Sequence, residues 1–469
     1  MSLLQEKDAG PVSGAPPTGV LGWMLFDWAA QPFFTVIVTF IFGPYFVSEL
    51  GSDPVRGQTA WAHAATLAGL LVAIAAPFAG ALSDTAGRNK RFIAAMAVIQ
   101  AASLALLWFA VPGTGYFWPA VLIIAATVMA ELSVVFNDAM LPHLVRPERM
   151  NRVSNDAWGL GYLGGMVFLI AVVVFLSADP ESGLTILGKA PLFGFDPLTG
   201  EAARLTGPLA ACWYIVFLLP FFVFTPDRPP LKPAGRALAD GFADLKATLA
   251  ALKGRPVLIR FLIARMLYMD GVNGILILGG AFAAGMFGWS TMEIGIFGIV
   301  LNVAAIFGCF FASRFGRQAN AGTVVLIALL MLVTATLGVV STTGEATVFG
   351  LLSFAPSTGT GLFSAGAEKA FLAYGVLIGL AFGPVQAGSR AFLATRIARQ
   401  EAGRFFGLFS LTGRMTSFLA TGAFAILTDW TGSPNLGMAS LLVFLVAGLV
   451  LFVPLMGSGD RRQQCDRRL

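Results

Sequence analysis

Residues 80–91 read GALSDTAGRNKR, and they overlap the end of an apolar run at 60–83. An α-helix rises ~1.5 Å per residue, so a hydrocarbon core of ~30 Å requires about 20 apolar residues. Glycines allow two helices to approach closely. Asp84 lies at the expected helix end, where a carboxylate can pair with basic groups or with the positive N-terminus of another helix. The stretch therefore predicts a membrane-spanning helix followed by a short basic loop.

The composition of the whole chain indicates the same class of protein. Of 469 residues, 57% are hydrophobic and only 12% are charged, whereas soluble globular domains carry about 25% charged residues. A chain this apolar could not cover its surface with polar groups, so the excess must face lipid. The net charge of +5 arises from short basic clusters between apolar runs, which favours a bilayer over nucleic acid as the partner.

The length rule predicts twelve membrane-spanning helices in two sets of six. The first set lies near 20–47, 60–83, 92–111, 116–140, 154–178 and 208–225. The second set lies near 257–287, 291–313, 321–341, 370–394, 405–428 and 436–457. We therefore expect an all-α membrane protein with two pseudo-symmetric six-helix bundles.

These spans divide the chain into tails, bundles and a linker. The segments are an N-terminal tail at 1–19, an N-terminal bundle at 20–225, a linker at 226–256, a C-terminal bundle at 257–457 and a basic tail at 458–469. Alternating apolar and polar residues at 237–252 predict an interfacial helix in the linker. The alternative is a linker without a fixed helix.

The distribution of Lys and Arg predicts the orientation. The loops that follow spans 2, 4, 8 and 10 are basic, and so is the C-terminal tail. The opposite loops contain only Arg56, Lys189, Arg204 and Lys369. The positive-inside rule therefore places both termini in the cytoplasm. The richness in Ala, Gly and Arg favours a bacterial plasma membrane.

The two halves of the chain resemble each other weakly. At an offset of 252 residues, Arg152 matches Arg404 and Asp138 matches Arg390. Related halves are typical of a transporter whose binding site lies between them at mid-membrane. Chance matching of short basic loops is the alternative. Arg152 and Arg404 are gate candidates in the cytoplasmic loops. Asp138, Asp156 and Arg390 lie near the cytoplasmic helix ends, so we expect gate salt bridges there.

The loop at 80–91 closely resembles the signature loop of the major facilitator superfamily. The motif residues are Gly80, Asp84, Gly87, Arg88 and Lys90. The resemblance implies a gate latch that stabilises one conformation and does not contact substrate. The corresponding segment of the second half departs from the pattern, because Ser313 stands where the acid would be.

A narrower resemblance begins in the first span, where residues 23–33 read WMLFDWAAQPF. This stretch, with residues 136–165 and 383–414, is similar to the vacuolar-effluxer-like branch, also called the unknown major facilitator family. The branch includes the fungal autophagy-linked exporter of amino acids from the vacuole. The resemblance departs at Ala30–Gln31, where an Asn-Ser pair is common. It implies alternating-access transport of a small organic solute such as an amino acid, with export favoured.

Charged groups inside the expected spans are the main functional candidates, because burying one costs about 2.5–3.5 kcal/mol on insertion scales. Asp27 lies in the first span, within the motif at 23–33. One interpretation makes it a proton or substrate-amine site. The alternative is an ion pair with a cation from another helix, such as Arg414 or Arg265.

Span 7 contains three further candidates, Arg265, Asp270 and Asn273. The run DGVNG at 270–274 has low helix propensity and predicts a weakened helix, and broken helices expose backbone groups that can coordinate substrate. The alternative is a satisfied pair between Arg265 and Asp270.

Three other polar residues complete the substrate and coupling candidates. Glu131 in span 4 is either the protonated partner of a coupling step or a neutral acid that is hydrogen-bonded to a neighbour. Arg414 in span 11 is a candidate counter-charge for a substrate carboxylate or for Asp27. Gln386 in span 10 is a polar residue that could face a cavity.

Several classes of protein are disfavoured. No G-x-x-x-x-G-K loop occurs, which leaves direct ATP coupling unsupported, and two histidines and three scattered cysteines disfavour a metal or haem site. We expect no enzyme activity, no cofactor and no nucleic-acid partner. We expect the protein to be a monomer in the lipid bilayer and to bind a small solute and protons. The rival hypotheses are a sugar–cation symporter or drug exporter, and a membrane scaffold without transport.

Overall fold

The computed structural model describes residues 15–51, 54–177, 183–185, 187–195, 199–227, 250, 252–287, 289, 291–315, 320–355, 362–414 and 417–456. The interfacial helix expected at 237–252 lies outside the described residues, except for Ala250 and Leu252. The basic tail at 458–469 also lies outside them, as do residues 1–14.

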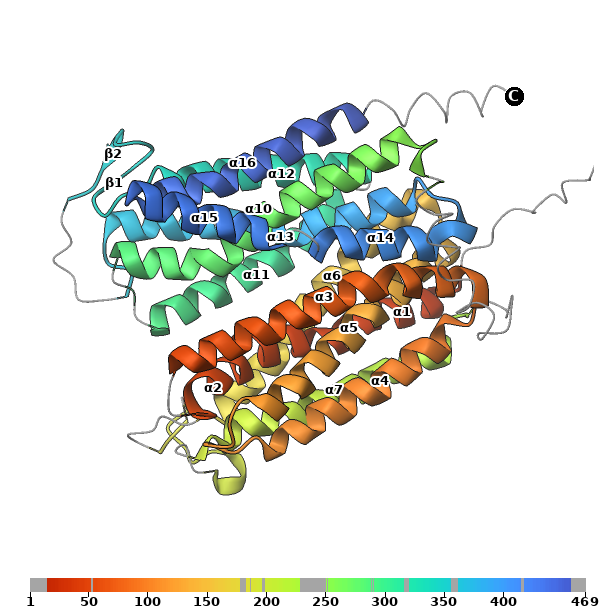
Figure 1. The fold of residues 1–469 in the computed structure, drawn as a ribbon, viewed down its shortest axis with the longest axis horizontal. Coiled ribbons are helices and arrows are strands. Elements are labelled where there is room, and N and C mark those ends of the chain that lie inside the picture. Colours follow the sequence, from red (N-terminus) through yellow and green to blue (C-terminus); the bar gives the residue numbers. More distant parts are fainter. Residues whose placement is uncertain are drawn as a thin grey trace, which may run out of the picture.

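The described helices form two bundles that lie against each other (Figure 1). The first half contains α1 (Pro17–Pro32), the π-helix η1 (Phe33–Phe40), α2 (Phe42–Glu49), α3 (Pro54–Ala86), α4 (Asn89–Leu106), η2 (Leu107–Phe109), α5 (Phe117–Leu144), α6 (Pro147–Phe175), η3 (Leu192–Gly194) and α7 (Glu201–Phe224). The second half contains α10 (Pro256–Phe287), α11 (Thr291–Phe315), α12 (Ala321–Val340), β1 (Ala346–Thr347), β2 (Leu352–Ser353), α13 (Gly366–Ala394), η5 (Arg399–Glu401), α14 (Ala402–Arg414), α15 (Ser417–Thr431), α16 (Pro434–Phe452) and η6 (Val453–Leu455).

The helices have the length and composition of membrane spans. Eleven described helices are long and apolar enough to cross a bilayer, and the first of them runs continuously over Pro17–Glu49. The twelfth crossing consists of α14 and α15. The second of these contains a shorter apolar helix at Leu419–Thr428. The expectation of an all-α membrane protein with twelve spans in two bundles is confirmed.

The first span changes its helical form after Pro32. This proline has no N–H to donate and its ring crowds the preceding turn, and the residues that follow, FFTVIVTF, are aromatic or β-branched residues with modest helix propensity. They adopt a π-helix that ends at Ile41, where φ is −119°. The span is therefore irregular over Phe33–Ile41 and becomes an α-helix again in α2.

The prediction of a weakened helix at 270–274 is wrong, because α10 is continuous there. The glycines of this run pack against α16 instead of breaking the helix. A Cβ on Gly271 would lie 2.9 Å from Leu445 Cγ, and one on Gly274 would lie 2.7 Å from Leu441 Cδ2. Close packing between helices therefore outweighs the low propensity of the run.

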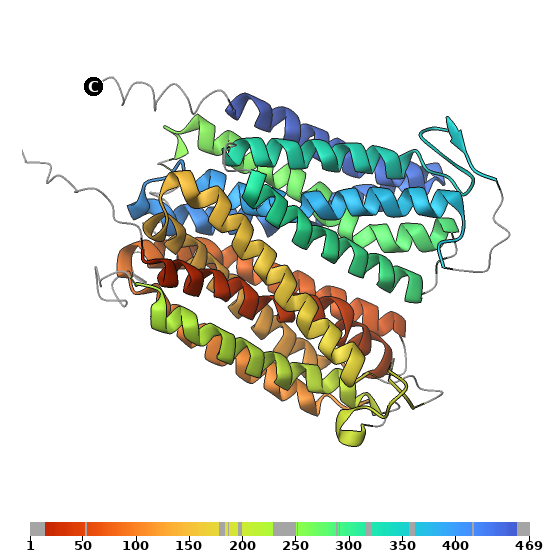
Figure 2. The same cartoon turned by 180° about the vertical axis from the view of Figure 1, so that it is seen from behind.

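The bundle has two ends, which we name by what lies there. The terminal end is where α1 begins and α16 ends, and the hairpin end is where the β1–β2 hairpin lies (Figure 1). At the terminal end α14 packs along α3, whereas α15 packs against α16 and α10. Figure 2 shows the opposite face, where α6 and α11 pack between the bundles. The α3–α14 and α6–α11 contacts therefore join the two halves.

Candidate functional site

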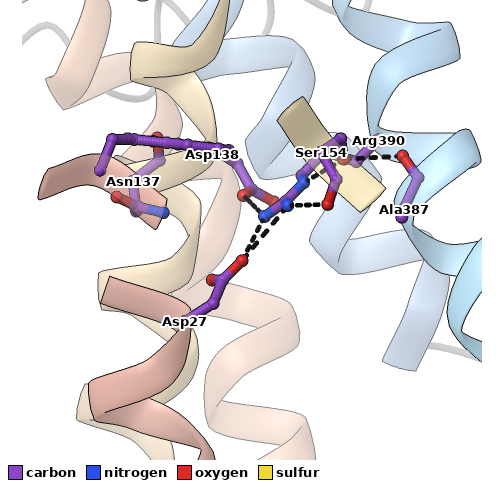
Figure 3. Close-up of polar contacts among 7 residues, drawn as sticks. Asp27, Asn137, Asp138, Ser154, Ala387 and Arg390 are labelled. Atoms are coloured by element: carbon purple, nitrogen blue, oxygen red, sulfur yellow. Dashed lines mark hydrogen bonds and ion pairs between the residues drawn. The ribbon is translucent and has the colours of Figure 1, made fainter. Parts of the chain in front are cut away.

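Arg390 of α13 crosses from the second half into three helices of the first half (Figure 3). Its Nη1 lies 3.0 Å from Asp138 Oδ1 on α5, and Nη1 and Nη2 each lie 3.2 Å from Asp27 Oδ2 on α1. Its Nε donates to Ser154 Oγ on α6 at 2.8 Å, and Nη2 donates to the Ser154 carbonyl at 3.0 Å. We call these four residues the Arg390 cluster.

Aromatic rings enclose the guanidinium of the Arg390 cluster. The guanidinium carbon lies 4.9 Å from the centre of the Trp23 ring and 5.8 Å from that of Trp158. The Trp23 indole N–H donates to the Asn137 carbonyl at 2.8 Å, which fixes the orientation of the ring. Rings at these distances favour a cation and keep water from it.

The cluster is buried unevenly. The side chains of Arg390 and Asp138 are 2% and 8% exposed, whereas that of Asp27 is 15% exposed. Both hydrogen bonds from Arg390 to Asp27 go to Oδ2, which leaves Oδ1 outside this contact. With both acids ionised, the cluster has two negative charges and one positive charge. Asp27 is therefore the member that a proton or a ligand can reach most easily.

Two further polar contacts connect α6 and α13. The Ser154 hydroxyl donates to the Ala387 carbonyl at 2.8 Å. Two turns further along α6, the Tyr162 hydroxyl accepts a hydrogen bond from the Gln386 amide at 3.3 Å. Gln386, a sequence candidate, is half-buried and faces the partner half.

The motif at 80–91 places a second link at the terminal end. The Asp84 carboxylate accepts from the backbone N–H groups of Gly403 at 2.7 Å and Arg404 at 2.8 Å, at the start of α14. A helix N-terminus has free N–H groups and partial positive charge, so it suits a carboxylate. A Cβ on Gly80 would lie 2.2 Å from the Gly403 carbonyl oxygen. We call Gly80, Asp84, Gly403 and Arg404 the terminal latch.

The other motif residues make contacts within the first half. Gly87 and Arg88 form the turn after α3, with φ values of +63° and +50°, a region that glycine adopts at no steric cost. The Lys90 ammonium donates to the Phe222 carbonyl at 2.8 Å, and its backbone N–H donates to Asp227 at 3.3 Å. Lys90 thus connects α4 to the end of α7.

The structure gives Asp27 a different partner from those expected. The cation beside it is Arg390, and Arg265 makes other contacts. Arg265 turns toward α14, where its Nη1 donates to the Phe409 carbonyl at 2.6 Å and to the Thr412 hydroxyl at 3.0 Å. The side chain of Arg414 lies outside the described part of the chain.

The remaining candidates lie at separate places. Asp270 is buried in α10, 1% exposed, while Asn273 and Glu131 are half-buried in α10 and α5. Arg152 pairs with Asp156 on the same helix at 3.6 Å, and both side chains are partly exposed. Across the residues that the structure describes, no group of three His, Cys, Asp or Glu side chains could hold a metal ion.

Sequence reasoning missed Ser154, Trp23 and Trp158 as neighbours of Arg390. None of them carries a charge, so the search for ionisable groups in apolar spans passed over them. One signal was present, because Asp138 and Arg390 match at the 252-residue offset and their side chains are in contact.

Comparison with known proteins gives relatives along nearly the whole chain. The family model described as "Vacuole effluxer Atg22 like" matches residues 55–464. The chain is 24% identical over 452 residues to the "Uncharacterized MFS-type transporter YxiO" of Bacillus subtilis (strain 168), which covers 94% of this chain and 96% of that protein. It is 24% identical over 319 residues to Autophagy-related protein 22-1 of Aspergillus niger, which covers 65% of this chain and 46% of that protein. The chain thus spans about half the length of the fungal relatives that it matches.

Solved structures share the fold. The E. coli transporter FucP in the outward conformation superposes with a TM-score of 0.68 at 11% identity, over 94% of this chain and 98% of that one. The human organic anion transporter MFSD10 (TETRAN) superposes with a TM-score of 0.64 at 16% identity, over 93% of this chain and 100% of that one. At these identities the likeness establishes the arrangement of helices.

Proposed function

Since the chain belongs to the vacuole effluxer Atg22-like family and is an integral membrane protein with the major facilitator fold, we propose that it exports amino acids in exchange for protons. The coarse class, an MFS-type transporter, is shared with its bacterial relative. The amino-acid substrate, the direction and the proton are our proposal. The name of the family, an effluxer, favours export.

The charge of the Arg390 cluster is the observation that carries this proposal. One guanidinium lies between two carboxylates, so the cluster has an excess of one negative charge. An unbalanced charge is costly in a membrane interior that is closed to water. A proton or an ammonium group on Asp27 would remove the imbalance before the site is occluded.

Competition at Asp27 provides the exchange. A proton from one side neutralises Asp27, and the ammonium group of a solute from the other side takes its place when the proton leaves. Either occupant gives a balanced cluster, whereas an empty Asp27 does not. The halves can move only when this one cation site is filled. The proton flux and the solute flux are therefore coupled in opposite directions.

Alternating access requires both links between the halves to open and close. Arg390 draws all of its hydrogen-bond acceptors in the cluster from the first half. A proton or ammonium group on Asp27 weakens the pull of that carboxylate on Arg390. The terminal latch must then separate for the site to open at the terminal end.

We place the terminal end in the cytoplasm of a bacterial cell, because the basic loops lie there. Single cysteines in the β1–β2 hairpin and in the loop at 145–146 would test this orientation with a membrane-impermeant thiol reagent applied to intact cells. Labelling in the hairpin and protection at 145–146 is expected. The reverse pattern contradicts the orientation.

Proteoliposomes that are acidic inside test the exchange itself. Uptake of labelled amino acids is expected to exceed the uptake at equal pH, because protons leave as the solute enters. Asp27→Asn should remove this dependence on the gradient, whereas Asp156→Asn, on the surface of α6, should keep it. Unchanged coupled flux in Asp27→Asn rules out its role in binding the proton.

The rivals predict other results in the same assay. A sugar–cation symporter accumulates sugar when the outside is acidic, and a drug exporter transports apolar cations and ignores amino acids. A scaffold without transport shows no flux and tolerates neutral replacement of Asp27 and Arg390.

A further inference from the structure

Arg265 is a buried cation in the second half that the proposed exchange does not use. It lies on α10 and is 8% exposed. Its Nη1 donates to two neutral acceptors on α14, the Phe409 carbonyl at 2.6 Å and the Thr412 hydroxyl at 3.0 Å. The guanidinium carbon lies 3.4 Å from the centre of the Phe409 ring. These contacts hold the plane of the guanidinium in one orientation.

Arg265 forms no ion pair with any side chain that the structure describes. Its Nε has no hydrogen-bond partner among the described residues. A buried guanidinium that meets only neutral acceptors is costly, and its free donors are arranged to take a carboxylate or phosphate in a fork. Among the described residues, the guanidinium therefore has no anionic group in direct contact with it.

A side chain at position 413 of α14 would crowd the guanidinium. Gly413 lies next to it, and a Cβ at that position would lie 3.1 Å from Nη1 and 3.3 Å from Nη2. Asp138 of the Arg390 cluster interacts electrostatically with Arg265, although its Oδ1 is bound to Arg390. Arg265 is thus near the cluster but belongs to the opposite half.

We propose that Arg265 binds the carboxylate of the transported solute. This inference rests on the proposed function and assigns the second charged group of the substrate. A zwitterion would place its ammonium group at Asp27 in the first half and its carboxylate at Arg265 in the second half. Such a solute contacts both halves, so its binding favours a conformation in which they are close.

The assignment predicts discrimination by charge. An amide or amine that lacks the carboxylate leaves the guanidinium buried without an anion. A lost charged hydrogen-bond partner of this kind reduces affinity by about tenfold or more. An acid that lacks the amine still binds Arg265 but leaves Asp27 to a proton.

Thermal shifts of the purified full-length protein test the assignment with matched probes. For alanine, leucine, phenylalanine and lysine, the probes are the free amino acid, its amide and the acid without the α-amine. We expect the wild type to prefer at least one free amino acid over its amide by about tenfold or more. Arg265→Gln should bind the amino acid and the amide equally. The matched control is Arg260→Gln, an exposed arginine of the same helix that donates to the Leu451 carbonyl at 3.1 Å, and it should keep the preference.

A second variant covers the case in which Arg265→Gln does not fold. Gly413→Ala keeps the charge but introduces a methyl group beside Nη1 and Nη2, so the preference for the carboxylate should fall. The inference is overturned if the wild type binds amide and amino acid equally, if both variants keep the preference, or if no probe of the panel binds.

The assay separates this inference from the exchange at Asp27. If amides are transported with the same dependence on the pH gradient as amino acids, the role of Arg265 fails and the exchange stands. If carboxylates bind through Arg265 but no flux responds to the gradient, the exchange fails and the carboxylate site stands.

Discussion

The Arg390 cluster and the terminal latch both join the two halves, but with different chemistry. The cluster uses a guanidinium between two carboxylates and a serine, deep in the interior. The latch uses a carboxylate on two backbone N–H groups and a glycine contact in which two main chains nearly touch. In the proposed exchange, a proton or a solute changes the charge of the cluster directly. The latch opens only when α3 and α14 move apart.

The largest effect is expected from Arg390→Gln, which breaks the cluster and leaves two buried carboxylates without their cation. Removal of one partner from a buried ionic cluster costs about 3–5 kcal/mol of unfolding free energy. Denaturation in mixed detergent measures the loss. The double variant Asp138→Asn with Arg390→Gln should recover part of it, and an equal loss in both would contradict the charge argument.

A smaller effect is expected from Gly80→Ala in the latch. The new methyl group would overlap the Gly403 carbonyl oxygen, from which an ideal Cβ lies 2.2 Å away. Overpacking of this kind costs about 1–3 kcal/mol. It destabilises only the conformation in which the terminal end is closed. Distances between spin labels at the terminal ends of α3 and α14 should lengthen. Gly69→Ala is the control, because a Cβ there meets nothing within 4 Å.

Asp84→Asn sharpens the comparison further, because it keeps the shape of the latch and removes its charge. Loss of a carboxylate at a helix N-terminus costs about 0.5–2 kcal/mol. The same spin-label distances should show a larger open population, while the pH dependence of transport stays that of the wild type. A change in that pH dependence would mean that the latch also takes part in coupling.

The smallest effect is expected from Arg152→Gln. Arg152 was a gate candidate, but in this structure it pairs with Asp156 on its own helix, with 42% of its side chain exposed. Exposed pairs of this kind contribute about 0–1 kcal/mol. Both stability and the spin-label distances should be close to those of the wild type. A clear shift in the distances would show that Arg152 serves a gate in another conformation.

The sequence was a good guide to whatever depends on local composition. The twelve spans follow from apolar runs, and the signature loop at 80–91 identified Asp84 before its partner was known. Asp27 was found as a charge in an apolar span, and Asp138 and Arg390 were found as gate candidates near the helix ends. The contact between Asp27 and Arg390 was not predicted, because these residues are 363 positions apart in the sequence and belong to different bundles. Which arginine reaches Asp27 depends on how the bundles pack.

The failure in α10 has a related cause. The run at 270–274 is locally a poor helix, and local propensity was the only information used. The glycines there fit against Leu441 and Leu445 of α16, a contact that no local pattern reveals. Ser154 was missed because a hydroxyl carries no charge and gains its role only when Arg390 arrives from the other half.

The contact between Asp138 and Arg390 limits how alike the two halves can be. Side chains at matching positions that touch must lie close to the axis that relates the halves. If both halves had one sequence, this position would meet its own copy, and two aspartates or two arginines would repel head-on. Opposite charges at that point make the halves non-interchangeable, so two copies of either half alone could not reproduce this junction.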